Sequence, residues 1–401
     1  MAEKLKRAAE KQGKSINQMV KDTLKQHLGM SKDKKFTLIH HDLDHLFGRW
    51  SEEDFKRIQR KIDSERKSQG GIKMKRVIVL GFAVLMMLTL VGPAAAQYKA
   101  TMKLASALAL DHPYMIGAQK FAELIKERTN GRIEVKLYPS LQLGKGEREM
   151  CEGIQQGAID LLVTSTGPLG GFSPSINILD FPFLFRDFAH VDLVMDGPIG
   201  RKLLDDFEKA DIKGLAFWEN GFRHLTNAKR QVKKAEDGKG LKIRTMENKV
   251  HLAAWKSAGL NPTPMAWGEV FTALQQNVID GQENPIAVFY SSKLWDAGQK
   301  NFSLTAHVYS PSPFLMSKKI FDAMPKEDRE LFLKTGMEVA KFQRKVNRDA
   351  EENKLQDIAK AGVTVVRDVD RQNFKKAMSP VYDQFSSQFP KAEIEAIMNA
   401  K

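Results

Sequence analysis

The residues with the clearest chemistry are two arginines and an asparagine in one stretch of the chain. Arg223 stands in "ENGFRHLTN", Arg244 ends "GLKIR", and Asn284 follows an Asp-Gly turn in "VIDGQENP". A guanidinium presents a planar fork that holds a carboxylate through two parallel hydrogen bonds. A neighbouring amide both donates and accepts hydrogen bonds. These types favour a site for an organic acid, although either arginine alone is also typical of a surface salt bridge.

The elements that must position these residues alternate between strands and helices. The segment "ATMKLASAL" is strand-like, 112–129 is an amphipathic helix, and "RIEVKLYP" alternates with a period of two. A helix over 147–156 and the buried strand "AIDLLVTS" follow. This order predicts a mainly parallel sheet with helices on both faces. Ligands of such sheets bind beyond the carboxyl ends of strands, and Arg244 is expected at one of these ends.

The pattern continues through the rest of the chain. Further strands are expected at "KGLAFWEN", "GLKIRT" and 302–309, and further helices at 248–258 and 267–276. Residues 326–361 are expected to form a long charged helix with modest breaks.

Other polar residues near these strand ends are secondary candidates. Thr164 and Ser165 end the strand "AIDLLVTS" and are expected to offer hydroxyl groups to a ligand. His112, near the end of the first strand, either reaches the ligand or caps its own helix. Glu219 and Glu283 are neighbours of the arginine motifs. Because a carboxylate repels an acidic ligand, we expect these two acids to orient the arginines or the backbone.

Composition and charge narrow the class of protein. The 401 residues are 42% hydrophobic and 28% charged, which is typical of a globular chain with two or more domains. The net charge is +14, but residues 1–73 carry +7 of it and residues 74–96 carry +2. The remaining chain therefore has no polyanion-binding signature. The single cysteine, Cys151, excludes an internal disulfide or a C-x-x-C site, and we expect it to pack inside a helix.

Motifs of catalysis and of metal binding are missing. The sequence has no G-x-S-x-G, P-loop, H-E-x-x-H or complete G-x-G-x-x-G. The segment "HHDLDH" at 40–45 contains metal-ligating types, but without an ordered spacing, so we interpret it as a polar linker. We expect neither enzymatic activity nor a cofactor, and an α/β enzyme is the disfavoured alternative.

Residues 74–96, "MKRVIVLGFAVLMMLTLVGPAAA", have the pattern of an export signal. Two basic residues precede the apolar run 77–91, and three alanines after Pro93 match a small-residue cleavage site. The run is also marginally long enough for a membrane anchor. The alanine ending and the sequence beyond it favour cleavage, so we expect the mature protein to begin near Gln97 and to be periplasmic.

Residues 1–73 precede this signal and need a separate explanation. Codons for Gln69–Gly71 can contain AAGGAGG, a bacterial ribosome-binding sequence, at a suitable spacing before Met74. We therefore expect Met74 to be the true start and residues 1–73 to belong to an upstream reading frame joined in frame. If the codons for Gln69–Gly71 lack a purine-rich GGAGG core, this argument for a start at Met74 is lost.

The segment 1–73 is expected to be all-α. Its two helical patterns are separated by Gly13, and the second runs from a capping box at Ser15 to Gly29. The pair resembles the helices of a ribbon–helix–helix antitoxin without the strand that reads DNA. The segment "DLDHLFGRWSEEDFKRIQRKID" resembles the tail that grips a toxin, with Phe47 and Trp50 as anchors. An antitoxin-like regulatory protein is thus a distant alternative function through these residues.

Residues 98–401 resemble the solute-binding proteins of TRAP transporters, the DctP-type family. The resemblance is carried by "TNGRIEVKLYPSLQLG", "FPFLFRD", "GLKIR", "NPTPMAWGEVFTALQQNVIDGQENP" and "MSKKIFDAMP". It implies a two-lobed α/β clamshell with long C-terminal helices. Lobe I is expected at 98–220 plus 310–349, and lobe II at 221–309 plus 350–401.

The resemblance also implies roles for particular residues. Arg244, in the GLK-x-R motif, is expected to pair with the ligand carboxylate, and Arg223, in N-G-x-R, to be a second contact. Asn284, in DGQENP, is expected to face the ligand. Trp267, in "AWGEV", stands where the family lines the cleft with an aromatic ring, although plain core packing is equally open.

The expected function is capture of a small organic acid and its delivery to the small and large membrane subunits of a TRAP permease. Two arginines favour a C4-dicarboxylate, but both can hold one carboxylate, so sugar acids, hydroxy acids and keto acids stay open. Closure of the lobes would exclude water and strengthen the arginine–carboxylate pair. No nucleic acid or metal is expected for the mature protein, which the family implies is a monomer or a homodimer.

Overall fold

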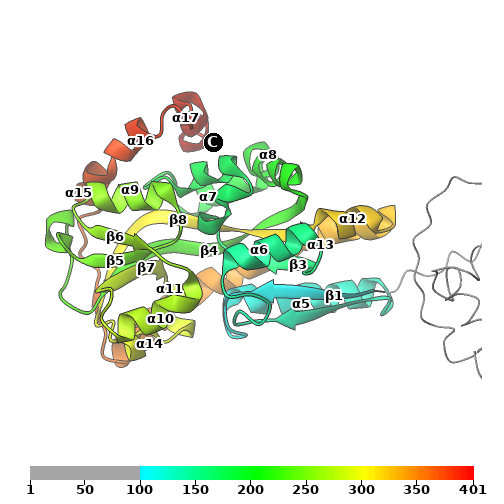
Figure 1. The fold of residues 1–401 in the computed structure, drawn as a ribbon, viewed down its shortest axis with the longest axis horizontal. Coiled ribbons are helices and arrows are strands. Elements are labelled where there is room, and N and C mark those ends of the chain that lie inside the picture. The colour runs from blue at the N-terminus through cyan, green and yellow to red at the C-terminus, as the bar shows by residue number, and fades with distance from the viewer. Residues whose placement is uncertain (1–99) are drawn as a thin grey trace, which may run out of the picture. The chain divides into compact units, whose positions relative to one another are not determined.

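A nine-stranded sheet forms the centre of residues 100–401, the part of the chain that the computed structural model describes (Figure 1). The predicted antitoxin-like segment, the polar cluster at 40–45, the start at Met74 and the export signal lie outside the described residues. The strands are β1 (Ala100–Ser106), β2 (Ile133–Tyr138), β3 (Leu161–Val163), β4 (Ile212–Asn227), β5 (Lys242–Thr245), β6 (Asn261–Pro264), β7 (Gly281–Pro285), β8 (Asn301–Ser317) and β9 (Thr364–Val366).

The sheet is parallel towards its two ends and antiparallel at its centre. Its order is β2-β1-β3-β8-β4-β7-β5-β6, and β9 pairs with β8. Parallel pairs join β1 to β2 and β3, β5 to β6 and β7, and β8 to β9. Antiparallel pairs join β8 to β3 and β4, and β4 to β7. The predicted parallel units are therefore present, and the long strands β4 and β8 connect them.

Helices cover both faces of this sheet, as predicted (Figure 1). The α-helices are α5 (Pro113–Arg128), α6 (Glu147–Gln156), α7 (Phe188–Asp196), α8 (Pro198–Asp205), α9 (Lys249–Ser257), α10 (Trp267–Gln275), α11 (Ile286–Ser291), α12 (Lys318–Ala323), α13 (Lys326–Asp349), α14 (Glu351–Lys360), α15 (Arg371–Met378), α16 (Pro380–Gln384) and α17 (Lys391–Met398). The 3₁₀ helices are η1 (Gly167–Gly171), η2 (Pro174–Asp180), η3 (Asp206–Ala210), η4 (Ala235–Gly238) and η5 (Leu294–Ala297). No helix within 100–401 has the length and apolar character needed to cross a bilayer.

The short strand β3 is almost continuously apolar because it is buried on both faces of the sheet. Leu161 and Val163 pack into the core that includes α5 and α13, whereas Leu162 packs into the core that includes α6 to α9. A strand buried on both faces has no polar side. Cys151 is buried inside α6, which confirms its expected packing role.

The helix bounds follow the sequence signals closely. The helix predicted at 147–156 is α6, and Gly157 ends it in the left-handed conformation, with φ of 77°. The predicted helix 112–129 is α5, with His112 as its N-cap. The long charged helix predicted at 326–361 is divided at Ala350 into α13 and α14.

The two long strands deviate from regular pairing near their middle. The register between β4 and β8 shifts between Glu219 and Gly221, and Gly221 is paired with Ser310. Gly221 has φ of 119°, a conformation that glycine adopts without the steric cost of a Cβ. Such irregularities bend a strand, so β4 changes direction between the two ends of the sheet.

Candidate functional site

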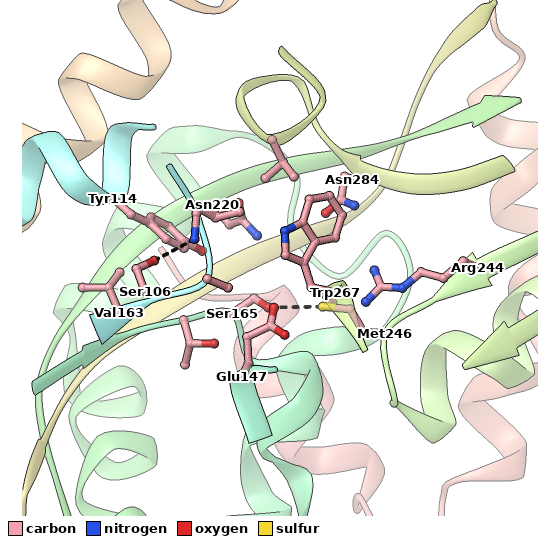
Figure 2. Close-up of a pocket in the computed structure, with 14 residues that line it drawn as sticks. Ser106, Tyr114, Glu147, Val163, Ser165, Asn220, Arg244, Met246, Trp267 and Asn284 are labelled. Atoms are coloured by element: carbon pink, nitrogen blue, oxygen red, sulfur yellow. Dashed lines mark hydrogen bonds between the residues drawn. The ribbon is translucent and has the colours of Figure 1, made fainter. Parts of the chain in front are cut away.

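A pocket lies where the carboxyl ends of parallel strands from both ends of the sheet converge (Figure 2). Residues at the ends of β1, β3 and β5 line it, together with residues of β4 and β7 and the starts of α6 and α10. Its volume is about 330 Å³, including the part open to solvent. This position agrees with the rule for ligands of open α/β sheets.

Arg244 contributes a buried positive charge, with no ion-pair partner among the described residues, to this pocket. Its side chain extends from β5, the residue is 2% exposed, and Nε donates to the Met265 carbonyl at 2.8 Å. Within 100–401, Nη1 and Nη2 have no hydrogen-bond partner and the guanidinium forms no ion pair. Burial lowers the pKa of Arg244 to about 10, against the opposing charges of Glu147 and Glu283. The group therefore stays charged at neutral pH and has its outer edge free for an anion.

Trp267 stands beside Arg244 and connects the surrounding cores. It is the first residue of α10, and its ring packs against all three hydrophobic clusters of the described chain. The Arg244 guanidinium carbon lies 5.7 Å from the centre of this ring, within the range of a cation–π contact. The sequence analysis left open whether Trp267 lines the cleft or packs in the core. In the structure it lines the pocket and also packs against the core clusters.

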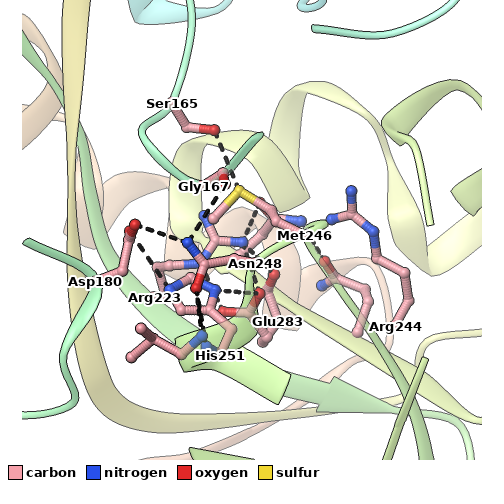
Figure 3. Close-up of polar contacts among 12 residues, drawn as sticks. Ser165, Gly167, Asp180, Arg223, Arg244, Met246, Asn248, His251 and Glu283 are labelled. Atoms are coloured by element: carbon pink, nitrogen blue, oxygen red, sulfur yellow. Dashed lines mark hydrogen bonds and ion pairs between the residues drawn. The ribbon is translucent and has the colours of Figure 1, made fainter. Parts of the chain in front are cut away.

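Arg223 does not line the pocket but is fully buried next to it, paired with Glu283 (Figure 3). Its Nε lies 2.5 Å from Glu283 Oε2, and its Nη2 lies 2.9 Å from Glu283 Oε1. Nη2 also donates to the side-chain oxygen of Asn284 at 3.0 Å. Nη1 has no partner among the described residues. The charge of Arg223 is thus largely neutralised within the protein.

The environment of Glu283 keeps this carboxylate ionised. Burial alone would raise the pKa of Glu283, but the charge of Arg223 and hydrogen bonds from His307 and Arg223 lower it well below its ordinary value. The His307 ring nitrogen Nε2 lies 3.0 Å from Glu283 Oε2. His251 lies between Glu283 and Asp180, with Nδ1 4.0 Å from the former and Nε2 3.5 Å from the latter (Figure 3). The expected role of Glu283 in orienting an arginine is confirmed.

The second acid next to the arginine motifs, Glu219, orients a different part of the molecule. It is fully buried on β4 and accepts hydrogen bonds from Tyr309, Asn347 and Arg348. The arginine that it holds belongs to α13 and not to the pocket. Glu219 therefore fixes the long helix to the sheet.

Asn284 lines the pocket with its amide orientation already fixed. Its side-chain oxygen accepts from Arg223, and its Nδ2 donates to the side chain of Gln282. An amide nitrogen has two hydrogens, so one of them is left for a further acceptor. Asn284 lies in β7, a strand that the sequence analysis did not predict.

Thr164 and Ser165 both line the pocket at the end of β3. The Thr164 hydroxyl is buried and has no partner among the described residues. The Ser165 hydroxyl donates to the sulfur of Met246 at 3.2 Å, a weak acceptor that follows β5 (Figure 2). Both hydroxyls can therefore donate a hydrogen bond to a stronger acceptor.

His112 adopts the capping alternative that the sequence left open. It is fully buried, and its Nδ1 accepts from the backbone N–H of Tyr114 at the start of α5, at 3.1 Å. Burial lowers the pKa of His112, with the charge of Lys354 as a smaller cause, so the ring is neutral. His112 does not line the pocket, but its ring packs edge-on against Tyr114, which does.

Four polar residues of the pocket, Ser106, Tyr114, Glu147 and Asn220, were not singled out from the sequence. Glu147 begins α6, and burial raises its pKa, while the charge of Arg244 opposes this most strongly among the charged groups. Asn220 is 4% exposed, and its side-chain oxygen has no partner among the described residues. Asn220 stands inside the quoted "ENGFR" motif, whereas Glu147 in "GKGERE" resembles the acidic first turn of any helix. Within 100–401 no group of His, Cys, Asp and Glu is arranged to hold a metal ion.

Comparison with known proteins places the chain in a family. The model of the bacterial extracellular solute-binding protein, family 7 (DctP), matches residues 104–388. The chain belongs to this family. The 2,3-diketo-L-gulonate-binding periplasmic protein of Escherichia coli is 40% identical to this family 7 protein over 276 residues, 69% of this chain and 84% of the relative. The C4-dicarboxylate-binding periplasmic protein of Rhodobacter capsulatus is 32% identical over 304 residues, 74% and 90% of the two chains.

Solved structures of the family have the same fold. A TRAP periplasmic solute-binding protein from Polaromonas, determined with D-erythronate bound, is 45% identical and superposes with a TM-score of 0.74. The match covers 76% of this chain and 99% of the other. The predicted two-lobed α/β fold and the predicted family are therefore confirmed. The assignment of individual ligand-binding residues stays a prediction.

Proposed function

We propose that this family 7 protein captures a small organic acid outside the cytoplasm and delivers it to the two membrane subunits of a TRAP permease. The observation that carries the proposal is Arg244, a buried guanidinium that has no carboxylate partner within the described chain. A buried charge is costly unless it is paired. The ligand carboxylate would supply the missing partner.

The contacts around Arg244 suggest how a carboxylate is held. Because Met265 fixes Nε, the Nη1 and Nη2 groups are left to donate to the acid. Asn284 has an amide hydrogen left, and Thr164 and Ser165 offer hydroxyls. Arg223 would position Asn284 through its hydrogen bond to the Asn284 side-chain oxygen. A direct contact of Arg223 with the ligand would have to use Nη1, which has no partner among the described residues. His112 would act through Tyr114.

The names and bound ligands of the relatives support an organic acid without selecting one. One relative is named for a diketo sugar acid, another for C4-dicarboxylates, and the Polaromonas structure contains a hydroxy acid. A carboxylate is the feature that these ligands share. At this level the proposal covers the C4-dicarboxylates favoured from the sequence and the sugar, hydroxy and keto acids left open beside them.

Closure of two lobes would complete the site. We assign 98–220 plus 310–349 to lobe I, and 221–309 plus 350–401 to lobe II. The irregular pairing at Gly221 and Ser310, and the division between α13 and α14 at Ala350, support these boundaries. Closure would exclude water and strengthen the ion pair with Arg244, giving binding and release without turnover.

Export places this binding outside the cytoplasm. The family description is extracellular, and the relatives from Escherichia coli and Rhodobacter capsulatus are named as periplasmic. We propose that residues 74–96 are the signal peptide, that the mature protein begins near Gln97, and that it functions in the periplasm as a monomer or a homodimer.

The test compares ligand binding by the wild type and by Arg244→Ala. The full 401-residue chain is expressed, and the protein is purified in the form that the cell produces, then unfolded and refolded to remove bound ligand. Thermal unfolding is followed with C4-dicarboxylates, sugar acids, hydroxy acids and keto acids. Saturation at about one hundred times the dissociation constant adds roughly 2.7 kcal/mol to the free energy of unfolding. We expect stabilisation of the wild type by at least one acid.

Arg244→Ala should weaken the binding of that acid by roughly 30-fold or more, because truncating one partner of a buried charge pair costs about 2–5 kcal/mol of binding free energy. Arg367→Ala is the control, since its exposed ion pair with Glu352 is remote from the pocket. Equal affinity of the two variants would contradict the proposal, as would turnover of the bound acid.

A further inference from the structure

A buried cluster of polar side chains lies beside the pocket and joins two loops that form part of its wall (Figure 3). The loop after β3 brings Thr164 and Ser165 to the pocket, and the loop after β5 brings Met246. The loops approach so closely that a Cβ added to Gly167 would lie 2.5 Å from Met246 Cε. The members of the cluster are buried and do not line the pocket; they are Thr166, Asp180, Asn248 and His251.

Asn248 is the centre of this cluster and uses both ends of its side-chain amide. Its Oδ1 accepts from the backbone N–H groups of Val250 and His251, at 2.9 and 3.0 Å, and so caps the start of α9. Its Nδ2 donates to Asp180 Oδ2 at 2.8 Å and to the Gly167 carbonyl at 3.3 Å. The acceptor end of the amide therefore serves its own helix, while the donor end reaches the other loop.

Asp180 is a fully buried carboxylate whose contacts come from both loops. Its Oδ1 accepts from the Thr166 hydroxyl at 2.7 Å and lies 3.5 Å from His251 Nε2. A buried carboxylate is costly unless donors surround it, and hydrogen bonds to a charged group are stronger than those between neutral groups. Separation of the two loops would take Asn248 and His251 away from Asp180.

The hydrogen bond between Asn248 and Asp180 crosses the boundary between the two proposed lobes. Asp180 belongs to lobe I within 98–220, and Asn248 belongs to lobe II within 221–309. The pair of Arg223 and Glu283 differs in this respect, because both of its members belong to lobe II. Since Asn248 does not line the pocket, its substitution leaves the groups that face the ligand in place.

We propose that Asn248 is a positioning residue that holds the closed lobes together through Asp180 and thereby sets the rate at which the bound acid is released. Because this hydrogen bond forms once the lobes meet, its loss speeds opening and leaves the first encounter with the acid unchanged. The inference rests on the proposed function, since it needs an acid held by Arg244 between two lobes. It assigns the retention of that acid to residues that do not touch it.

The test variants exchange amide and carboxylate groups. Asn248→Asp still accepts from the first N–H groups of α9, but it replaces the donor with a second acid facing Asp180. Combining it with Asp180→Asn restores one donor and one acceptor in exchanged positions. Asn373→Asp is the matched control, because Asn373 Nδ2 also donates to a carboxylate, that of the exposed Glu236 at 3.1 Å, within lobe II alone.

The measurement separates release of the acid from stability of the fold. The full chain is expressed and freed of ligand by unfolding and refolding, and the probes are D-erythronate, succinate and 2,3-diketo-L-gulonate. Stopped-flow tryptophan fluorescence at pH 7.5 gives both rate constants for the acid that the wild type binds most tightly, with Trp267 of the pocket as the reporter. Urea unfolding of the ligand-free protein gives the free energy of unfolding.

Asn248→Asp should raise the dissociation rate constant at least about tenfold, because a buried hydrogen bond to a charged group is replaced by repulsion. The association rate constant should change less than about threefold. The double variant should return the dissociation rate constant to within about threefold of the wild type, since the two substitutions restore each other's partner. Asn373→Asp should match the wild type in both rate constants. Should Asn248→Asp fail to fold, Asp180→Asn takes its place with the same expected direction.

Two outcomes overturn the inference. One is a dissociation rate constant that Asn248→Asp leaves unchanged. The other is a faster release that the double variant does not reverse and that accompanies a matching loss of ligand-free stability, as expected for damage to the local fold. If Arg244→Ala abolishes binding in either case, the proposed function stands and only the role of Asn248 is lost. If none of the three acids binds to the wild type, both proposals fail.

Discussion

At the scale of single residues, the two arginines show that a partner decides what a side chain is available to do. Arg223 is paired with Glu283, whereas Arg244 forms no ion pair within the described chain. The motifs indicated both arginines and Asn284, but the pairing of Arg223 with Glu283 depends on β4 lying against β7. Periodicity does not indicate which strands are neighbours, so the sequence could not separate the two roles.

Removing the charge of Glu283 should strongly destabilise the fold. Glu283→Gln leaves the Arg223 guanidinium buried without a counter-charge, and breaking such a pair costs about 3–5 kcal/mol. Urea unfolding at pH 7.5 measures the free energy of unfolding. The matched variant Glu338→Gln breaks a more exposed ion pair with Arg128 and should cost no more than about 1 kcal/mol. Equal losses in the two variants would contradict the role of the buried pair.

At the scale of elements, the segment before α6 and the start of α10 meet beside the pocket. A Cβ added to Gly268 would lie 2.8 Å from the Lys145 carbonyl oxygen and 3.1 Å from Leu141. A Cβ added to Gly146 would lie at an ordinary 3.4 Å from Ala266. The glycine at 268 therefore permits a close backbone approach between two segments that carry Glu147 and Trp267 into the pocket.

Gly268→Ala should weaken ligand binding while leaving the fold intact. The added methyl group forces the two segments apart, and overpacking of this kind costs about 1–3 kcal/mol of folding stability. The resulting displacement of Glu147 and Trp267 should lower the affinity for the ligand roughly tenfold, or about 1.4 kcal/mol of binding free energy. Alanine is a better helix former than glycine, so α10 itself is not weakened. Calorimetry with the best acid measures the effect, and Gly146→Ala is the control with room for its Cβ. Unchanged affinity in Gly268→Ala would show that this contact does not take part in binding.

Long periodic elements were predictable from the sequence, and short irregular ones were not. The bounds of α6 were predicted correctly, while β4 and β8 extend beyond the predicted segments. β6 reads "NPTP" and β7 reads "GQENP", which have the composition of turns. Proline is tolerated in β6 because it is an edge strand. In the pocket, Glu147 was missed because a glutamate in a first turn is common on any helix.

At the scale of the whole described unit, the partly buried Glu351 lies near Gly221, where the long strand β4 bends. Glu351 begins α14, and a Cβ on Gly221 would lie 3.8 Å from its Oε1. Burial, and then the charge of Glu219, raise the pKa of Glu351 to about 7, against the opposing charges of Lys354 and Arg348. Ionisation of the Glu351 carboxyl is therefore less favourable in the folded protein than in the unfolded chain.

Glu351→Gln should stabilise the protein at pH 8 but not at pH 4.5. The unfolded carboxyl has a pKa of 4.5, so the folded protein loses stability as the pH rises from 4.5 to about 7 and no further above that. The variant lacks this loss, which is worth about 3 kcal/mol for a shift of this size. Urea unfolding at both pH values measures it, with the exposed neighbour Glu352→Gln as control. The same difference at both pH values would refute the titration of Glu351.

The antiparallel centre of the sheet also determines when the chain can fold. Ile212 pairs with Ser317 and Asn227 with Asn301, and β3 and β9 also depend on β8. Contacts between residues so distant in sequence form slowly, because a long loop must close before any of them is made. A growing chain therefore has no central sheet until its last quarter has been synthesised. We expect this delay to keep the polypeptide unfolded during the interval in which an exported protein must be threaded through a membrane.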